Sequence, residues 1–246
     1  MNLVSVIIPA KNEAKNITAT LEGIRETFKR ENVNYDIIVV NDGSTDELKN
    51  VIKDISMRDS RVRLIDNQKT NGFGNAIKQG LENYWGDIVI ITMADASDDP
   101  NDMVHYVRTI EEGADCCFGS RWCKEAQVEG YPPLKYALNR LVNGFINLLF
   151  GLRYNDTTNA FKAYSRQTIE GIKPILARHF NITVELPLKA IVRGYSYKVI
   201  PTHWRERKKG ISKLKLQEMG SRYLFIILYI FLEKLLCKGD YKKITK

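Results

Sequence analysis

Residues 86–113 read GDIVIITMADASDDPNDMVHYVRTIEEG and contain a complete strand, loop and helix. The first eight residues are an apolar run rich in β-branched side chains, which predicts a buried strand. The last fifteen begin with a proline in an acidic first turn and end at a glycine, a pattern typical of a helix. The carboxylates of Asp95, Asp98 and Asp99 follow the strand directly. The unit therefore places concentrated negative charge at the end of a buried strand.

The alternation of strand and helix continues in both directions from this unit. Apolar residues at helical spacing from Ile17 to Phe28 predict a helix, with Asn16 as its N-cap. The expected strands are apolar on both faces, which predicts a mostly parallel sheet with helices on both sides, a doubly wound α/β fold. The expected strands are 3–10, 35–42, 62–66, 86–93, 114–121 and 194–204, and the expected helices are 16–30, 47–56, 72–85 and 99–113.

After residue 130 an amphipathic helix is expected over residues 134–152. Its apolar stripe runs from Leu134 through Leu141 to Leu148, and the polar side chains of residues 139, 140, 143 and 147 fall on other faces. Two interpretations remain open from the sequence. The helix either packs on its own domain or lies on a membrane surface.

The C-terminal segment is apolar and basic. Residues 223–232, YLFIILYIFL, are ten apolar residues in a row. As a helix they span about 15 Å, which is half of the ~30 Å hydrocarbon core of a bilayer. We expect this segment either to lie in the membrane interface, with Tyr223 and Tyr229 near the headgroups, or to dock on the domain or a second copy. In the membrane case anionic lipid would face the basic residues Arg222, Lys234, Lys238, Lys242 and Lys243.

Composition narrows the class of protein. The 246 residues are 44% hydrophobic and 27% charged, which is ordinary for a globular domain. The last 46 residues carry 12 Lys or Arg against 4 Asp or Glu, so they account for the net charge of +8. The N-terminus lacks the features of a secretory signal, and the four cysteines form no CxxC pair. We therefore expect reduced thiols in a cytoplasmic protein. A nucleic-acid partner is disfavoured, because the apolar tail does not interleave aromatic and basic residues.

Acidic and glycine-containing turns follow several of the expected strands, and ligands of doubly wound sheets bind beyond the carboxyl ends of the strands. Carboxylates there, without His or Cys, suit a hard cation such as Mg²⁺ or Mn²⁺, which typically holds a diphosphate. Asp42 and Glu13 could accept hydrogen bonds from a ribose or a base. GFGNAI, residues 72–77, allows a close backbone approach or a tight turn, but it is not a dinucleotide fingerprint, and no P-loop sequence occurs.

In order and spacing, these segments resemble family 2 glycosyltransferases with the GT-A fold. Two later segments resemble the polyprenyl-phosphate hexosyltransferase branch of that family, which dolichol-phosphate mannose synthase typifies. The resemblance covers roughly residues 4–216. Its early motifs are VSVIIPAKNEAKNI, IIVVNDGSTD, GFGNAIKQG, TMADASDDP and GSRW, and its later ones are NDTTNAFKAY and VIPTHWRERKKGISKLK.

The resemblance implies a role for individual residues. It divides the chain into a GT-A domain, residues 1–216, and a basic, apolar helix, residues 217–246, as a possible membrane contact. It matches Glu185 to an acidic position of the family, for which a purely structural role is the alternative. The implied catalytic residues are Asp95, Arg121, Arg207 and Lys213; the nucleotide-binding residues are Pro9, Lys11, Glu13, Asp42 and Ala94; the metal-binding residues are Asp95 and Ser97; and the acceptor-side residues are Lys162 and Ser212.

Three positions depart from the family pattern. Met93 replaces the first aspartate of the DxD motif, so Asp95 is the expected metal ligand, while Asp98 and Asp99 are expected to support it or to cap the next helix. Lys162 stands where many relatives have arginine, which keeps the charge but loses the bidentate fork. TTNAF, residues 157–161, replaces a more usual Ser-Gly pair.

The resemblance implies an inverting, metal-dependent transfer of a hexose from a UDP- or GDP-sugar to a polyprenyl phosphate. The enzyme would work as a peripheral protein on the cytoplasmic face of the membrane. One alternative is a family 2 enzyme with a saccharide or protein acceptor, which would need a base such as Asp98, Asp99 or Asp156. The other is a nucleotide-sugar-binding protein that has lost transfer activity, as Met93 suggests.

Overall fold

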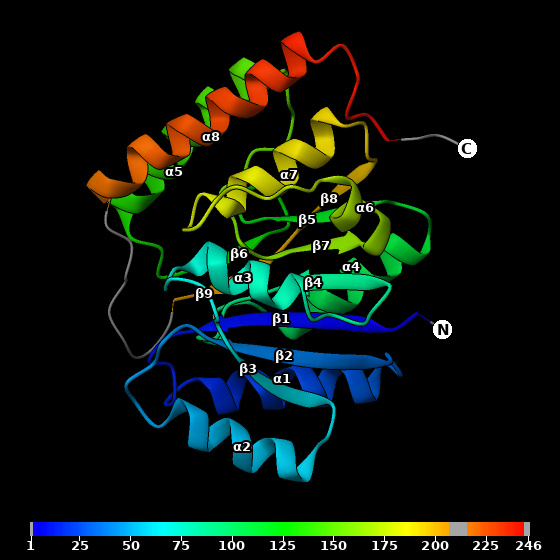
Figure 1. Cartoon of the computed structure of the whole chain (residues 1–246), viewed down its shortest axis with the longest axis vertical. Helices are drawn as coiled ribbons and strands as arrows, with labels where there is room; N and C mark the ends of the chain where they lie inside the picture. The colour runs from blue at the N-terminus through cyan, green and yellow to red at the C-terminus, as the bar shows by residue number, and fades with distance from the viewer. Residues whose placement is uncertain (1, 207–215, 244–246) are drawn as a thin grey trace.

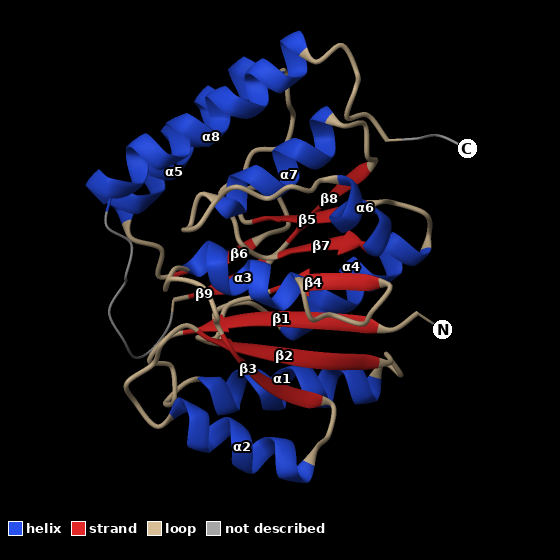
Figure 2. Ribbon diagram, in the orientation of Figure 1, coloured by secondary structure: helices blue, strands red, loops and turns tan. Residues whose placement is uncertain are grey.

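The computed structural model describes residues 2–206 and 216–243, and these residues form an α/β structure (Figure 1). Helices cover both faces of a central sheet (Figure 2). The strands are β1 Val4–Ala10, β2 Tyr35–Asn41, β3 Val62–Asp66, β4 Ile88–Ile91, β5 Cys116–Ser120, β6 Gln127–Glu129, β7 Lys162–Ser165, β8 Tyr197–Pro201 and β9 His203–Arg205. The helices are α1 Ile17–Arg30, α2 Leu48–Arg58, α3 Phe73–Leu81, α4 Pro100–Glu111, α5 Pro133–Phe150, α6 Arg166–Gly171, α7 Ile182–Val192 and α8 Leu216–Leu236.

Within the described residues the main sheet has seven strands in the order β3-β2-β1-β4-β7-β5-β8. All neighbours pair in parallel except β7, which runs antiparallel to both β4 and β5. The doubly wound, mostly parallel sheet expected from the sequence is therefore confirmed. Strand β7 was not predicted. The expected strand 194–204 is divided into β8 and β9, and β9 pairs with β6 in a separate two-stranded sheet.

Strand β1 shows why the sheet needs helices on both sides. Every residue of β1 is buried. Val6 and Ile8 contribute to a core with α1 and α4, whereas Ile7 contributes to the opposite core with α3, α7 and α8. Successive side chains of a strand point to opposite faces, so a strand that is apolar throughout must be covered twice.

Two helix starts test the capping predictions. Asn16 precedes α1, but its side chain makes no capping hydrogen bond and instead donates through Nδ2 to Glu13 Oε2 at 2.8 Å. Asn16 therefore stands at the predicted N-cap position, but the predicted capping hydrogen bond is absent. Asp99 caps α4, because its Oδ1 accepts the backbone N–H of Asn101 at 2.8 Å. Asp99, one of the acidic residues after β4, thus has a structural role as the N-cap of α4.

Helix α5 packs on the protein through Asn143, Ile146 and Phe150, which are buried. Leu141 is 70% exposed and Leu148 is 85% exposed, whereas Asn143 is fully buried. Asn139 Nδ2 donates to Thr158 Oγ1 at 2.8 Å, and Arg140 donates to the carbonyl of Asn155 at 2.9 Å. Helix α5 therefore packs on its own domain, with Ile146 and Phe150 in the core that also contains residues of α8, while Leu141 and Leu148 of the expected apolar stripe stay exposed.

Helix α8 lies beside α5 and packs on α7 (Figure 1). Ile226, Ile227 and Ile230 are buried in the same core as β1 and α3, and the buried pair Arg193–Glu233, at 2.7 Å, ties α8 to the end of α7. The opposite side exposes several large apolar side chains. Among the helices in residues 2–206 and 216–243, none is both long enough and apolar enough to cross a bilayer. The exposed apolar residues of α8 are Leu224, Phe225, Leu228, Leu232, Leu235 and Leu236.

Several side chains expected at lipid headgroups contact the protein instead. The hydroxyl of Tyr223 donates to the carbonyl of Phe180 at 3.1 Å. Lys234 Nζ donates to the carbonyl of Phe150, and Lys243 pairs with Asp115 at 2.8 Å. Tyr229 is half-buried, with the ammonium of Lys189 5.5 Å from its ring centroid. These contacts correct the expected orientation of the tail, while the exposed leucines remain available for a membrane.

Candidate active site

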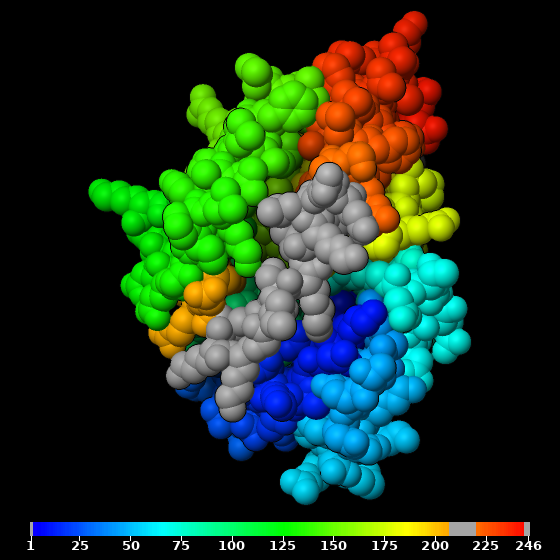
Figure 3. Space-filling model, turned by 90° about the vertical axis from the view of Figure 1, so that its left-hand side faces the viewer, coloured from blue at the N-terminus to red at the C-terminus, as the bar shows by residue number. Residues whose placement is uncertain are grey.

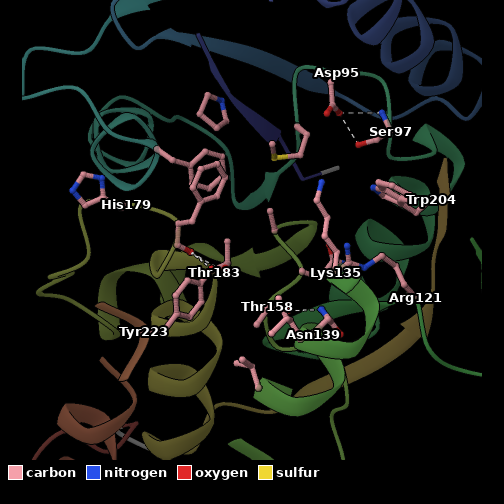
Figure 4. A pocket seen from close by; sticks show the side chains of 18 of the residues that line it. Asp95, Ser97, Arg121, Lys135, Asn139, Thr158, His179, Thr183, Trp204 and Tyr223 are labelled. Carbon is pink, nitrogen blue, oxygen red and sulfur yellow. Dashed lines mark hydrogen bonds between the residues drawn. The ribbon is translucent and has the colours of Figure 1, made fainter. Parts of the chain in front are cut away.

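A cavity of about 950 Å³ lies at the carboxyl ends of β1, β2, β4 and β5. The structure brings most of the predicted site residues together on its walls (Figure 4). Lys162 does not line it, and Arg207, Ser212 and Lys213 lie outside the described residues. The predicted residues that line the cavity are Pro9, Lys11, Glu13, Asp42, Ala94, Asp95, Ser97 and Arg121.

The turn after β2 holds Asp42 at one end of the cavity. Its Oδ1 accepts hydrogen bonds from the backbone N–H of Gly72 at 2.9 Å and from Asn67 Nδ2 at 2.8 Å. Gly72 and Gly74 have a packing role here, because a Cβ on Gly74 would lie 2.7 Å from the carbonyl carbon of Arg178. The glycines therefore let the start of α3 approach residues 177–179, and this approach places the Gly72 N–H against Asp42.

The loop after β4 places oxygen ligands in the middle of the cavity. Ser97 Oγ donates to Asp95 Oδ1 at 2.6 Å, and Ser97 N donates to the same atom at 3.3 Å (Figure 4). Asp98 Oδ2 accepts from Thr92 Oγ1 at 2.9 Å and from the backbone N–H of Met93 at 3.3 Å. Burial, followed by the neighbouring Asp95 charge, raises the pKa of Asp98 to about 7. The hydrogen bonds of Asp98 to Thr92 and Met93 tie the end of this loop to its start, with Asp95 between them.

The donor set of this loop fits a hard divalent cation. Asp95 and Ser97 offer carboxylate and hydroxyl oxygens, which Mg²⁺ and Mn²⁺ prefer. In the described part of the chain, no group of three or more His, Cys, Asp or Glu is arranged to hold a metal. A cation at Asp95 therefore needs oxygen ligands besides those of Asp95 and Ser97, which a diphosphate or water could supply.

Arg121 enters the cavity from the end of β5 as half of a buried ion pair. Its Nε and Nη2 donate to the two carboxylate oxygens of Asp156 at 2.8 and 2.9 Å, and its backbone N–H donates to Asp156 Oδ2 at 3.0 Å. Burial would raise the pKa of Asp156, but the charge and hydrogen bonds of Arg121 outweigh it and hold this pKa below its ordinary value. Asp156 is thus committed to Arg121 and is a poor candidate for a general base.

Lys162 lies beneath the cavity wall. It is 1% exposed, and its ammonium donates to the carbonyl oxygens of Thr157 at 3.0 Å, Thr183 at 3.3 Å and Asn159. Residues 158–160 line the cavity directly above it. The expectation that Lys162 faces an acceptor is corrected to a position behind the segment that does. Burial lowers the pKa of Lys162 to about 7, although the nearby Asp156 charge opposes this.

The buried ammonium predicts a stability that rises with pH. In the unfolded chain Lys162 stays protonated up to about its ordinary pKa of 10.5, whereas the folded chain releases the proton near 7. Between these values the unfolded state binds more protons, so the free energy of unfolding rises by up to about 1.4 kcal/mol per pH unit. Urea unfolding between about pH 7.5 and 9.5 should show this slope for the wild type relative to Lys162→Met. Parallel profiles would contradict it.

The far end of the cavity is apolar and lies between α5 and α8. Tyr223 closes one side, held by its hydrogen bond to Phe180. The cavity thus changes from carboxylates and cations near Asp95 to a slot that suits a hydrocarbon chain. The apolar side chains of this end are Leu138, Leu141, Val142 and Phe145 from α5 and Leu224 and Ile227 from α8.

Sequence patterns missed several residues that line the cavity. Trp204 was assigned only to a strand, and Tyr131 and Lys135 had no assigned role. Trp204 reaches the cavity because β9 pairs with β6, a contact between segments about 75 residues apart. The only sequence signal was a tryptophan shortly before the basic segment 205–209.

A doubly wound sheet with an acidic loop and a buried arginine at its carboxyl edge defines an enzyme of the GT-A glycosyltransferase type. Residues 5–172 match the model of the family described as Glycosyl transferase family 2. The chain belongs to this family and is a glycosyltransferase.

Two similar proteins have names that agree with this assignment. A polyprenol monophosphomannose synthase of Mycolicibacterium smegmatis is 26% identical over 217 residues, which cover 85% of this chain and 80% of that protein. A dolichol-phosphate mannosyltransferase of Pyrococcus furiosus is 29% identical over 218 residues, which cover 86% of this chain and 59% of that protein. The resemblance to the polyprenyl-phosphate branch is therefore confirmed, although this chain spans less than two thirds of the archaeal protein.

The fold also matches solved structures. Glucosyl-3-phosphoglycerate synthase from Mycobacterium tuberculosis, in complex with UDP, superposes with a TM-score of 0.69 at 17% identity, covering 95% of this chain and 80% of that one. This similarity confirms the GT-A fold.

Proposed function

We propose that this glycosyltransferase moves a hexose from a nucleoside diphosphate sugar to a polyprenyl phosphate at a membrane surface, with inversion at the anomeric carbon. The observation that carries the proposal is the shape of the cavity. It runs from Asp95 and Arg121 to an apolar slot between α5 and α8, whose outer sides expose leucines. A polar donor and a lipid-linked phosphate would meet where these two parts join. The names of the two relatives support the same acceptor.

The donor would occupy the polar end. Pro9, Lys11, Glu13, Asp42 and Ala94 line the part of the cavity suited to a base and ribose. Asp95 and Ser97 would hold Mg²⁺ or Mn²⁺, which when bound would neutralise charge on the diphosphate. A structural neighbour, the Mycobacterium tuberculosis synthase, was solved with Mn²⁺ and UDP, which supports this use of the fold.

A phosphate acceptor simplifies the chemistry. It is ionised at neutral pH, so attack on the anomeric carbon needs no strong base, and catalysis depends on positioning and on neutralising charge. Arg121 would supply a fixed positive charge facing the reacting phosphates. The predicted roles of Arg207, Ser212 and Lys213 concern residues outside the described chain and stay predictions. Lys162 would act by fixing residues 157–159.

The outer sides of α5 and α8 would rest on the membrane. The two helices lie together on one face of the molecule, α5 in green and α8 in orange (Figure 3). Their exposed leucines and Phe225 would enter the lipid interface, which places the mouth of the apolar slot at the bilayer surface. This arrangement supports a peripheral enzyme, which we propose works on the cytoplasmic face of the membrane.

Removing exposed leucines of α5 should weaken membrane binding without unfolding the protein. Burying a leucine side chain contributes about 1.5–3 kcal/mol, so removing two exposed leucines that do not line the cavity, in Leu134→Gln/Leu148→Gln, should lower the vesicle partition coefficient by about 10²- to 10⁴-fold. Co-sedimentation with anionic vesicles measures it. Met57, 79% exposed on α2, provides the matched control, and Met57→Gln should bind like the wild type. Equal loss in both variants, or none in either, would contradict this orientation.

A transfer assay tests the proposed function. Purified protein is incubated with Mg²⁺ or Mn²⁺ and a panel of UDP- and GDP-sugars, with and without a polyprenyl phosphate. We expect a radiolabelled product that is extracted into organic solvent and requires both the metal and the lipid phosphate. Nucleotide release without a lipid product would move the acceptor to a saccharide or a protein. Donor binding without turnover would favour the alternative in which Met93 marks a lost activity.

A further inference from the structure

Trp204 occupies a position in the cavity that the proposed roles above do not use. Its indole lies beside Ser97 and above Arg121, facing the same space as Asp95 (Figure 4). The ring of Tyr131 packs against it edge-on, with ring centroids 5.1 Å apart and planes at 66°. A large aromatic surface therefore forms the wall between the acidic loop and the buried arginine.

The backbone holds Trp204 to the loop that carries Asp95. Arg205 N donates to the carbonyl of Ser97 at 3.0 Å, and Asp99 N donates to the carbonyl of His203 at 3.4 Å. These bonds flank Trp204 on both sides along the chain. The indole is thus fixed relative to Asp95 by direct main-chain contacts.

Asp102 fastens the residues just before Trp204. Its side chain is buried, at 2% exposure, in the first turn of α4. Its Oδ2 accepts from Thr202 Oγ1 at 2.8 Å and from His203 N at 2.6 Å, and its Oδ1 lies 3.0 Å from His203 Nδ1. The carboxylate thus has its hydrogen-bond partners on the two residues that precede Trp204.

The place of the indole indicates which substrate group it meets. A sugar nucleotide whose diphosphate binds at Asp95 would carry its hexose next to this loop, on the polar side of the cavity. The lipid slot is lined by α5 and α8 instead. A pyranose ring has an apolar face of C–H groups, which the flat face of an indole can bury.

We propose that Trp204 contacts the hexose of the donor and selects for it, and that Asp102 is the positioning residue that holds Trp204 against the acidic loop. The inference rests on the proposed function, because it assumes a sugar nucleotide at Asp95. It adds the residue that distinguishes a sugar nucleotide from a bare nucleoside diphosphate.

The test compares two affinities in one calorimetric experiment with Mg²⁺. UDP is compared with UDP-glucose, and GDP with GDP-mannose, and the pair that binds the wild type is used. Trp204→Ala should weaken binding of the sugar nucleotide about 3- to 10-fold and leave binding of the nucleoside diphosphate unchanged. Trp204→Phe should restore part of the difference. Equal weakening of both ligands, or a change confined to the KM for polyprenyl phosphate, would overturn the sugar contact.

Asp115 provides a matched control for Asp102. It is also a buried carboxylate, and it accepts the N–H and hydroxyl of Ser196 at 2.8 Å just before β8, whereas Asp102 acts just after β8. Asp102→Ala and Asp115→Ala should both lower the melting temperature. Only Asp102→Ala should reduce the preference for the sugar nucleotide, and Asp102→Asn should restore it. Equal preference in both alanine variants would reduce Asp102 to a structural role.

The outcomes separate this inference from the proposed function. A wild-type protein that binds no nucleoside diphosphate would refute the proposed function. A wild type that binds both ligands, with Trp204→Ala unchanged for both, would refute only the role of Trp204.

Discussion

Replacing Asp95 with alanine should lower kcat for sugar transfer by at least about 10²- to 10³-fold, because the change removes the carboxylate that we propose holds a cation against the diphosphate. With Met93 at the position of the first aspartate, Asp95 has no duplicate in the motif. Transfer assays at saturating donor measure the rate. Mn²⁺ binding in the presence of a nucleoside diphosphate gives a second readout, which should weaken in the variant.

Asp99 gives the control for that experiment. It lies four residues further on and caps α4 through Asn101. Asp99→Ala should cost about 1 kcal/mol of stability through the lost cap. Its kcat and Mn²⁺ binding should match the wild type. An Asp95→Ala enzyme that keeps both properties would contradict the metal role.

Breaking the Arg121–Asp156 pair should have the largest effect on stability. Arg121→Met leaves the Asp156 charge buried without a partner, which is expected to destabilise the fold by about 3–5 kcal/mol. The same change removes the fixed positive charge from the cavity, so transfer should fall by about 100-fold even where the protein stays folded. Urea unfolding and the transfer assay measure the two effects separately.

A double variant separates the two roles of Arg121. In Arg121→Met/Asp156→Asn the buried charge is gone, while an amide oxygen can still accept the backbone N–H of residue 121. Stability should recover by several kcal/mol, roughly the penalty of the unpaired charge, while transfer stays low. Recovery of both properties would show that Arg121 acts only through folding.

The sequence predicted the parts of the fold that follow from local pattern. Short apolar runs identified β1, β2, β4 and β5, and the polar residues after them therefore met at one edge of the sheet. Strand β7 was missed because it has four residues and begins with Lys162. The ammonium of this lysine is accommodated in a central strand because the carbonyl groups of Thr157, Asn159 and Thr183 accept its hydrogen bonds.

The orientation of helices also depends on distant partners. The periodicity of α5 identified its apolar stripe correctly, but it could not show that Asn143 faces the protein and Leu148 faces outward. The same limit applies to Tyr223, whose partner Phe180 lies 43 residues earlier. Trp204 was missed for this reason, since its place in the cavity follows from the pairing of β9 with β6 and with the Asp95 loop.

The position of β7 has a consequence for the order in which the chain can fold during synthesis. Strand β4 ends at Ile91 and its neighbour β7 begins only at Lys162, so roughly 70 residues separate the two partners. At ribosomal rates of about 5–20 residues per second, the free edge of β4 waits about 4–14 s for its partner. During that interval the nascent protein exposes an unpaired apolar edge, which is a template for aggregation. Its yield in cells should therefore depend on chaperones that bind such edges until β7 emerges.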